Sequence, residues 1–129
     1  MNQPLNIVST ENAPAAIGPY SQAIAVNGLL FCSGQVALVP GGSELVGDGN
    51  VEAETRQALT NLKAVLEAGG SSMEKVIKTT VFLKSMDDFA AMNGVYTEAF
   101  GDARPARAAV EVARLPKDAM VEIDAVALI

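Results

Sequence analysis

The chain has 129 residues; half of them are hydrophobic, 5% are aromatic, and the formal net charge is −6. This length predicts one domain over residues 1–129, and the scattered lysines and arginines argue against nucleic acid as the main ligand. No apolar run approaches the ~20 residues that cross a bilayer, and the N-terminus shows no secretory signal. We therefore expect a cytoplasmic protein without membrane contact, with an organelle as the alternative in a eukaryote.

The sequence lacks histidine and has one cysteine, Cys32. This excludes Ser-His-Asp and Cys-His catalysis, and zinc sites that need imidazole or several thiolates. Gly-rich phosphate loops are also missing. The groups that remain are arginine, carboxylates, tyrosine, lysine and the backbone, and they suit binding a small carboxylate and moving protons or water. Cys32 is expected to be a core residue, since no histidine could activate it.

Three strands are predicted in the first third of the chain, at residues 5–9, 22–26 and 29–35. The last two are separated by an Asn-Gly pair, which is the strongest short signal for a hairpin. Gly34 lies near the end of the third strand. A glycine there marks either a bulge or a close approach by another backbone or a ligand.

Two loops are predicted around these strands. Residues 12–21 contain two prolines, which fix the shape of the loop. Tyr20 in this loop has two interpretations: an aromatic plug over the core edge, or a pocket wall with an available hydroxyl. Residues 40–49 hold one proline and four glycines and predict a surface loop.

Helical periodicity predicts two amphipathic helices. The first begins after Asn50, a favourable N-cap, and ends at a Gly-Gly pair at 69–70. The second begins near Ser85 and Asp88, ends at Gly101 and places the polar Asn93 next to its apolar stripe. Between the helices, a possible capping box predicts a helical turn from Ser71 to Glu74. A β-branched run at 76–83 then predicts a strand deep in the sheet.

The last quarter of the chain predicts two strands joined by a turn, within residues 104–118 and 120–125. Side chains alternate along a strand, so Arg107 and Glu111 share one face of the first strand. Glu122 and Asp124 share one face of the second. A cation and carboxylates on neighbouring strands form either a salt bridge or a pocket for a small anion.

The predicted order is therefore β-β-β-α-β-α-β-β, an α/β (α+β) fold with a mixed sheet and two helices on one face. The other face is expected to carry small apolar side chains together with Arg107 and Glu111. Two helices cannot cover both faces of such a sheet, so we expect a homo-oligomer in which subunits bury the open face. A site at that interface is sheltered yet reachable.

Four parts of the sequence resemble one family, in order and with matching spacing. They are Ile17–Ala23; Ser33–Gln35; Val76–Phe82 with Asp88, Phe89 and Asn93; and Arg104–Arg107, Val112–Lys117 and Glu122–Ala127. These motifs are similar to those of the reactive intermediate deaminase family, also called the YjgF family, over nearly the whole chain.

The resemblance implies a chorismate-mutase-like fold assembled as a homotrimer with active sites between subunits. It implies hydrolysis of 2-imino acids such as 2-iminopropanoate and 2-iminobutanoate, in exchange with 2-enamino acids, to 2-keto acids and ammonia. Pyridoxal-phosphate enzymes release these reactive species, and their removal protects such enzymes. The family needs neither a cofactor nor a metal.

The resemblance also implies roles for individual residues. Arg107 binds the substrate carboxylate, and Glu122 positions or activates the attacking water. The expected substrate-binding residues are Tyr20, Gly34, Asn93, Arg107 and Ala109. Some members carry cysteine at the place of Ala109, so its absence argues against a thiol mechanism and favours a backbone role. Asp124 is expected to be a supporting charge.

Other interpretations stay open. The protein is alternatively a non-catalytic trimer that binds keto acids or another protein. A further alternative is a ribonuclease or translation inhibitor, which the acidic charge and the absence of histidine disfavour. Arg107 and Glu122 could instead form a structural ion pair across the interface.

Overall fold

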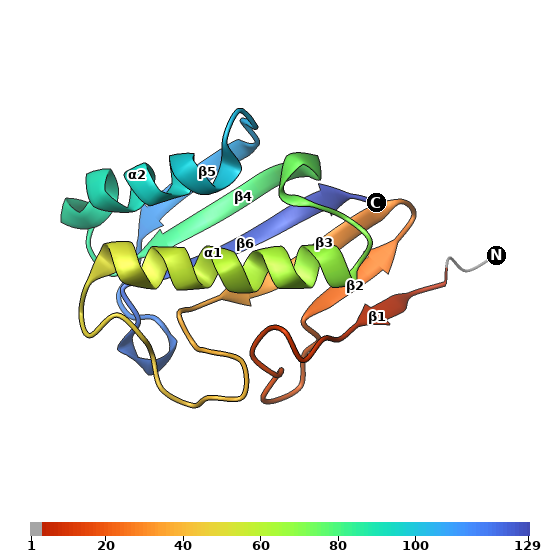
Figure 1. The fold of residues 1–129 in the computed structure, drawn as a ribbon, viewed down its shortest axis with the longest axis horizontal. Coiled ribbons are helices and arrows are strands. Elements are labelled where there is room, and N and C mark those ends of the chain that lie inside the picture. The colour runs from red at the N-terminus through yellow and green to blue at the C-terminus, as the bar shows by residue number, and fades with distance from the viewer. Residues whose placement is uncertain (1–3) are drawn as a thin grey trace.

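In the computed structural model, which describes residues 4–129, the strands form a single six-stranded sheet in the order β1-β2-β3-β6-β4-β5 (Figure 1). All neighbouring strands are antiparallel except β4 and β5, which are parallel. The strands are β1 (Asn6–Val8), β2 (Ala23–Val26), β3 (Leu29–Gln35), β4 (Val76–Leu83), β5 (Ala106–Glu111) and β6 (Val121–Leu128).

Two helices, α1 (Val51–Ala68) and α2 (Phe89–Phe100), lie side by side on one face of the sheet (Figure 1). The predicted α+β fold, with a mixed sheet and two helices on one face, is confirmed. The Asn50 side chain accepts a hydrogen bond from the Ala53 amide and caps α1, as predicted. Gly101 has a φ of +62° where α2 ends, a conformation that glycine adopts without steric cost. Neither helix is long and apolar enough to cross a membrane, as far as residues 4–129 show.

Three short 3-10 helices correct the predicted boundaries: η1 (Met73–Lys75), η2 (Met86–Asp88) and η3 (Pro116–Asp118). The predicted helical turn before β4 is present as η1. Its predicted cap was wrong, because the Ser71 hydroxyl donates to the Leu128 carbonyl and the side chain of Ser72 makes no capping bond to η1. Ser85 caps η2 through the Asp87 amide, so α2 starts only at Phe89. β3 and β4 have the predicted bounds, the ends of β1 and the start of β2 differ by one residue from the predicted ones, and β6 continues to Leu128, three residues beyond the predicted end.

The two faces of the sheet differ in what covers them. On β6, alternate residues from Val121 to Ala127 are buried against the helices, while Glu122, Asp124 and Val126 face the other way. The prediction that the open face carries Arg107 and Glu111 was wrong. The parallel register pairs Arg107 with Thr79, which is fully buried under α2, so Arg107 lies on the helix side of β5.

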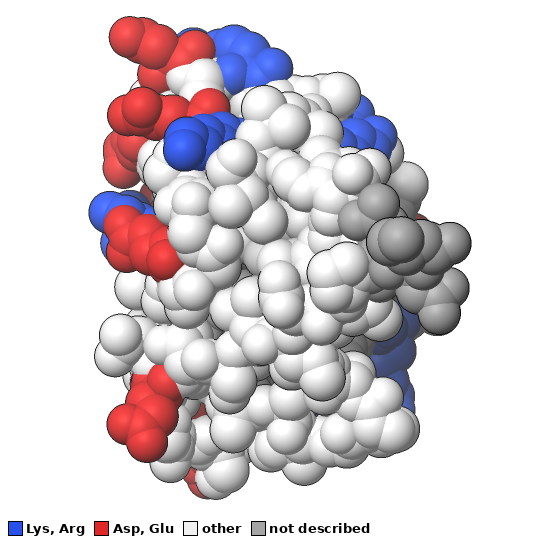
Figure 2. Space-filling view, turned by 90° about the vertical axis from the view of Figure 1, so that its right-hand side faces the viewer, with Lys and Arg blue, Asp and Glu red and all other residues white. Residues whose placement is uncertain are grey.

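The open face is partly apolar. Phe31, Val110 and Leu128 are 45%, 42% and 47% exposed. Figure 2 shows a further uncharged area at the end of the molecule on the right of Figure 1, and Ile7 of the edge strand β1 is 72% exposed. Exposed apolar side chains that gather on one face are typical of contacts with another protein chain.

A buried asparagine fixes the segment that follows β3. Asn61, on the inner side of α1, is completely buried, and its amide nitrogen donates to the carbonyl oxygens of Val36 and Leu38. Its side-chain oxygen accepts from Gln57. Irregular backbone near the core needs such partners, because a buried carbonyl without one is costly.

We expect Asn61→Ala to lower the free energy of unfolding by about 2 to 4 kcal/mol, because two carbonyls lose their donor. The adjacent exposed residue gives a matched control: Thr60→Ala should change stability by no more than about 0.5 kcal/mol. Urea denaturation of both variants measures the difference. Equal effects of the two substitutions would contradict the role assigned to Asn61.

Candidate active site

Arg107 is held in place by α2. Its Nη1 atom donates to Oδ1 of Asn93 at 2.7 Å. The guanidinium carbon lies 4.7 Å from the centre of the Tyr96 ring and 5.4 Å from that of Phe89, both within the range of cation–π attraction. The Tyr96 hydroxyl is fixed in turn by a 2.7 Å hydrogen bond with the buried Thr79 hydroxyl. The guanidinium therefore has a defined position before any ligand binds.

Sequence reasoning missed the contribution of Phe89 and Tyr96, which it assigned to the apolar stripe of α2. A signal was present: residues four and seven positions after Phe89 are Asn93 and Tyr96. This spacing places all three on one side of a helix. A polar residue between two aromatics on one helix face fits a site that receives a cation.

Arg107 lines an open hollow of about 400 Å³. The hollow is bordered by Asn93, Tyr96, Thr97, Phe100, Ala103, Arg104, Pro105 and Arg107, and none of these side chains is acidic. The only ion pair within residues 4–129 joins Lys84 and Asp118. Glu111 accepts a hydrogen bond from the Met86 amide at 2.8 Å, which is a structural contact. An arginine beside an acid-free hollow suits the binding of an anion.

Glu122 and Gly34 meet on the opposite face of the sheet. A β-carbon added at Gly34 would lie 2.1 Å from Oε2 and 2.8 Å from Cδ of Glu122, so only glycine leaves room for this carboxylate. The β3–β6 register shifts between Cys32 and Gln35, which places Gly34 in a bulge. The structure thus shows both features that the sequence offered as alternatives: a bulge, and a close approach, here by a side chain.

The Glu122 carboxylate is half-buried, and its pKa is raised, mainly by burial and secondarily by the negative charge of Asp124. Asp124 accepts a hydrogen bond from the Thr80 amide at 3.0 Å. A carboxylate with a raised pKa binds protons more readily near neutral pH, which suits a general base.

Tyr20 lies in the loop after β1 and is half-exposed; its hydroxyl accepts from the Ile17 amide at 3.4 Å. The loop is anchored by the buried Gln22, which bonds to the backbone of Thr10, Ala13 and Pro14. Ala109 lies on the same face of β5 as Arg107, and β5 is an edge strand that pairs only with β4 among the described residues.

The candidate residues therefore form two groups within one chain. Arg107, Asn93 and Ala109 lie on the helix side at β5, and Glu122 and Gly34 lie on the open face. Along the sheet, Arg107 and Glu122 are two strands apart, roughly 10 Å, and three residues out of register, roughly another 10 Å. Their side chains cannot contact one small substrate within a single chain.

Cys32 is buried, as expected, and burial, with a smaller contribution from Asp124, raises the pKa of its thiol to about 12. Such a thiol stays protonated and is a poor nucleophile. Within residues 4–129, the acidic and cysteine side chains form no cluster that could hold a metal ion.

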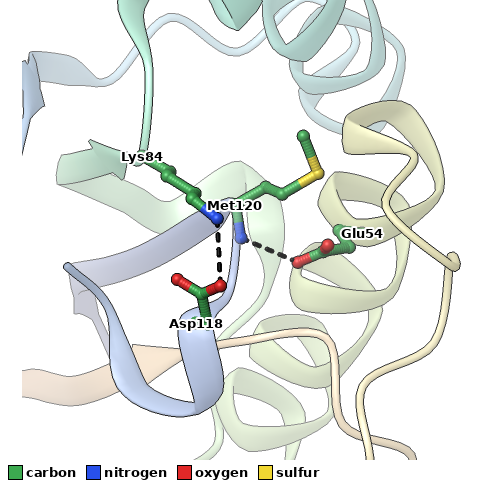
Figure 3. A network of polar contacts seen from close by, with 4 residues as sticks. All are labelled: Glu54, Lys84, Asp118 and Met120. Atoms are coloured by element: carbon green, nitrogen blue, oxygen red, sulfur yellow. Dashed lines mark hydrogen bonds and ion pairs between the residues drawn. The ribbon is translucent and has the colours of Figure 1, made fainter.

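A second polar cluster lies at the start of β6 (Figure 3). The buried Glu54 of α1 accepts from the Met120 amide at 3.0 Å, and Lys84 pairs with Asp118 at 3.0 Å. Burial raises the pKa of Glu54, and the Met120 amide opposes that shift. These contacts tie α1 to the turn before β6, so the cluster has a sufficient structural explanation.

The fold is that of a small α+β protein with an arginine-lined hollow at the edge of its sheet. Residues 10–129 match the model of the family described as Endoribonuclease L-PSP, and the chain belongs to this family. A RutC family protein of Synechocystis is 56% identical over 126 residues, 97% of each chain. The 2-iminobutanoate/2-iminopropanoate deaminase of Capra hircus is 49% identical over 122 residues, 95% of this chain and 88% of the goat protein.

Solved structures agree. YyfA of Yersinia pestis, a Rid family protein, has a TM-score of 0.94 and 42% identity, covering 98% of this chain and 100% of its own. Escherichia coli TdcF, crystallised with bound serine, has a TM-score of 0.90 and 41% identity, covering 96% and 98%. The resemblance to the reactive intermediate deaminase family is thereby confirmed.

Because the pKa of Glu122 is raised in the folded state, its ionisation opposes folding. Stability should be lost as the pH rises through the folded pKa. Glu122→Gln removes this effect, so the variant should gain thermal stability relative to the unmodified protein at pH 7, and less at pH 4. Thermal unfolding at both pH values measures the gain. A gain that is equal at both, or larger at pH 4, would contradict the assignment.

Proposed function

We propose that the protein hydrolyses 2-imino acids, such as 2-iminopropanoate and 2-iminobutanoate, to 2-keto acids and ammonia. The observation that carries this proposal is the Arg107 guanidinium, held by Asn93 and Tyr96 beside a hollow without acidic side chains. Relatives named as deaminases of these two imines support the choice of substrate. The imines exchange with 2-enamino acids, so both tautomers are consumed.

We further infer that each active site is completed between subunits of a homotrimer. Arg107 and Glu122 lie on opposite sides of the sheet, and the Glu122 side is partly apolar and uncovered. A second copy packed on the open face brings its own Arg107 side toward the first copy's Glu122. Gly34 then belongs to the Glu122 half of the site, and Asn93 and Ala109 to the Arg107 half.

In this site Arg107 binds the substrate carboxylate through the guanidinium nitrogens that Asn93 does not use. Glu122 takes a proton from water as the water oxygen bonds to the imine carbon. That proton passes to nitrogen, and Glu122 takes the remaining hydroxyl proton as the C–N bond breaks and the C=O bond forms, so ammonia and the 2-keto acid leave. Backbone groups near Gly34 and Ala109 orient the imine and its carboxylate, and Tyr20 lines the pocket.

These few groups suffice because a protonated imine is already electrophilic. Holding water and imine together contributes several orders of magnitude, and general-base assistance adds roughly 10²- to 10⁴-fold. We infer that the reaction removes imines released by pyridoxal-phosphate enzymes before they damage such enzymes.

The family description also names an endoribonuclease. A chain with a net charge of −6 lacks the basic surface that usually binds RNA. Among the described residues, the hollow with two arginines is about 400 Å³, which is the scale of a small molecule. Deamination is therefore the function that the site supports better.

We expect Arg107→Ala to lower kcat/KM for 2-iminobutanoate about 100-fold or more, because the carboxylate loses a charge-assisted anchor. The imine is generated from threonine by a threonine dehydratase, and ammonia release is measured. Arg114→Ala, which removes the same charge outside the hollow, should keep full activity. Full activity of Arg107→Ala in a correctly folded protein would refute the assigned anchor.

The glycine beside Glu122 gives a separate test. Gly34→Ala should displace the carboxylate and lower kcat by about 10-fold or more, because its β-carbon overlaps Glu122. Gly94→Ala is the matched control: nothing lies within 4 Å of the added carbon, and alanine favours the helix. Equal kcat values for the two variants would show that the position of Glu122 does not matter.

A further inference from the structure

Two arginines, not one, border the hollow at the end of α2. Arg104 and Arg107 both line it, in a chain with nine basic and fifteen acidic residues. Neither forms an ion pair within residues 4–129. The other hollows described in this part of the chain each include at least one acidic residue in their lining. Although the protein is acidic overall, the charged side chains that line this hollow are all basic.

Oxygen atoms of the protein orient both guanidinium groups, and each arginine donates through its own Nη1 atom. Nη1 of Arg104 donates to the carbonyl oxygens of Gly101 and Ala103, where α2 ends. Nη1 of Arg107 donates to Asn93. Among residues 4–129, no hydrogen bond uses the Nε or Nη2 atoms of either arginine. Each fork therefore retains donors for an anion.

The placement of the two arginines suits one ligand with two charges. They are three residues apart, on the order of 10 Å between Cα atoms, and the Arg104 side chain turns back to Gly101 and Ala103 at the end of α2, so that both arginines border the same hollow. The rest of the lining consists of Ala103, Pro105, two aromatic rings and the uncharged polar residues Asn93 and Thr97. This surface fits a short carbon chain between two carboxylates and offers no competing negative charge.

We propose that Arg104 is a specificity-determining residue that binds a second carboxylate, so that the site prefers imines of dicarboxylic amino acids, such as 2-iminosuccinate. This rests on the proposed deaminase function. Arg107 anchors the carboxylate next to the imine, and Arg104 binds the carboxylate at the far end. The hydrolysis is unchanged: water replaces nitrogen, and the products are oxaloacetate and ammonia.

The test compares two imines with four carbons each. 2-Iminosuccinate is generated from aspartate by an aspartate oxidase, and 2-iminobutanoate from 2-aminobutanoate by an amino acid oxidase. The two differ at the far carbon, which is a carboxylate in one and a methyl group in the other. Ammonia release gives kcat/KM for each, and calorimetry gives Kd for the products oxaloacetate and 2-oxobutanoate.

Arg104→Ala should lower kcat/KM for 2-iminosuccinate and weaken oxaloacetate binding, each about tenfold, and leave both values for the monocarboxylates within about twofold. Arg104→Gln, which keeps amide donors for Gly101 and Ala103, should have the same effect. Arg56→Ala removes one positive charge from α1, outside this hollow, and should leave the ratio unchanged.

An unchanged preference in Arg104→Ala and Arg104→Gln, or an equal loss for both imines, overturns the role of Arg104. The proposed function fails separately, if the unmodified protein releases no ammonia from either imine. Arg104-dependent binding of oxaloacetate in that case would still support a dicarboxylate site.

Discussion

The contact that the candidate site depends on is the one between Arg107 and α2. Thr79 holds the Tyr96 hydroxyl, the Tyr96 ring lies next to the guanidinium, and Asn93 accepts one of its N–H groups. Hydrogen bonds and cation–π contacts thus fix a cation that has no carboxylate partner within residues 4–129. Because the Arg107 side chain is already held in place, it loses little conformational freedom when an anion binds. More of the interaction energy therefore appears as affinity.

The position of that contact determines what one chain can do. The parallel pairing of β4 and β5 directs Arg107 toward the helices, whereas the alternation along β6 directs Glu122 away from them. Gly34 allows the Glu122 carboxylate to lie against β3. A single chain therefore presents the Arg107 guanidinium and the Glu122 carboxylate on different faces. Association of copies is the simplest way to join them, and the exposed apolar residues of the open face favour it.

The sequence predicted those parts of the fold that depend on local patterns: both helices, the Asn-Gly hairpin and the Asn50 cap. It failed where contacts with distant segments of the chain determine the local structure. Ser71 bonds to Leu128, 57 residues away, instead of capping a helical turn, and the face of Arg107 depends on pairing with Thr79 across two elements. The motifs identified the candidate residues Arg107, Asn93 and Glu122, but not Tyr96, whose ring looks like any core aromatic in a sequence. Gly34 was recognised from its place in a strand, although the group that approaches it was not.

The central claim is that Arg107 and Glu122 of different subunits form one site, and mixing inactive variants tests it most directly. Arg107→Ala and Glu122→Gln are each purified as homotrimers, then unfolded and refolded together in equal amounts. With random assembly, each mixed trimer has about one intact site in three, which is about a quarter of all sites in the sample, so deaminase activity should return to about a quarter of that of the unmodified protein. If both residues of a site came from the same chain, no intact site could form. Activity that stays at the level of the separate variants, in demonstrated mixed trimers, would contradict the account.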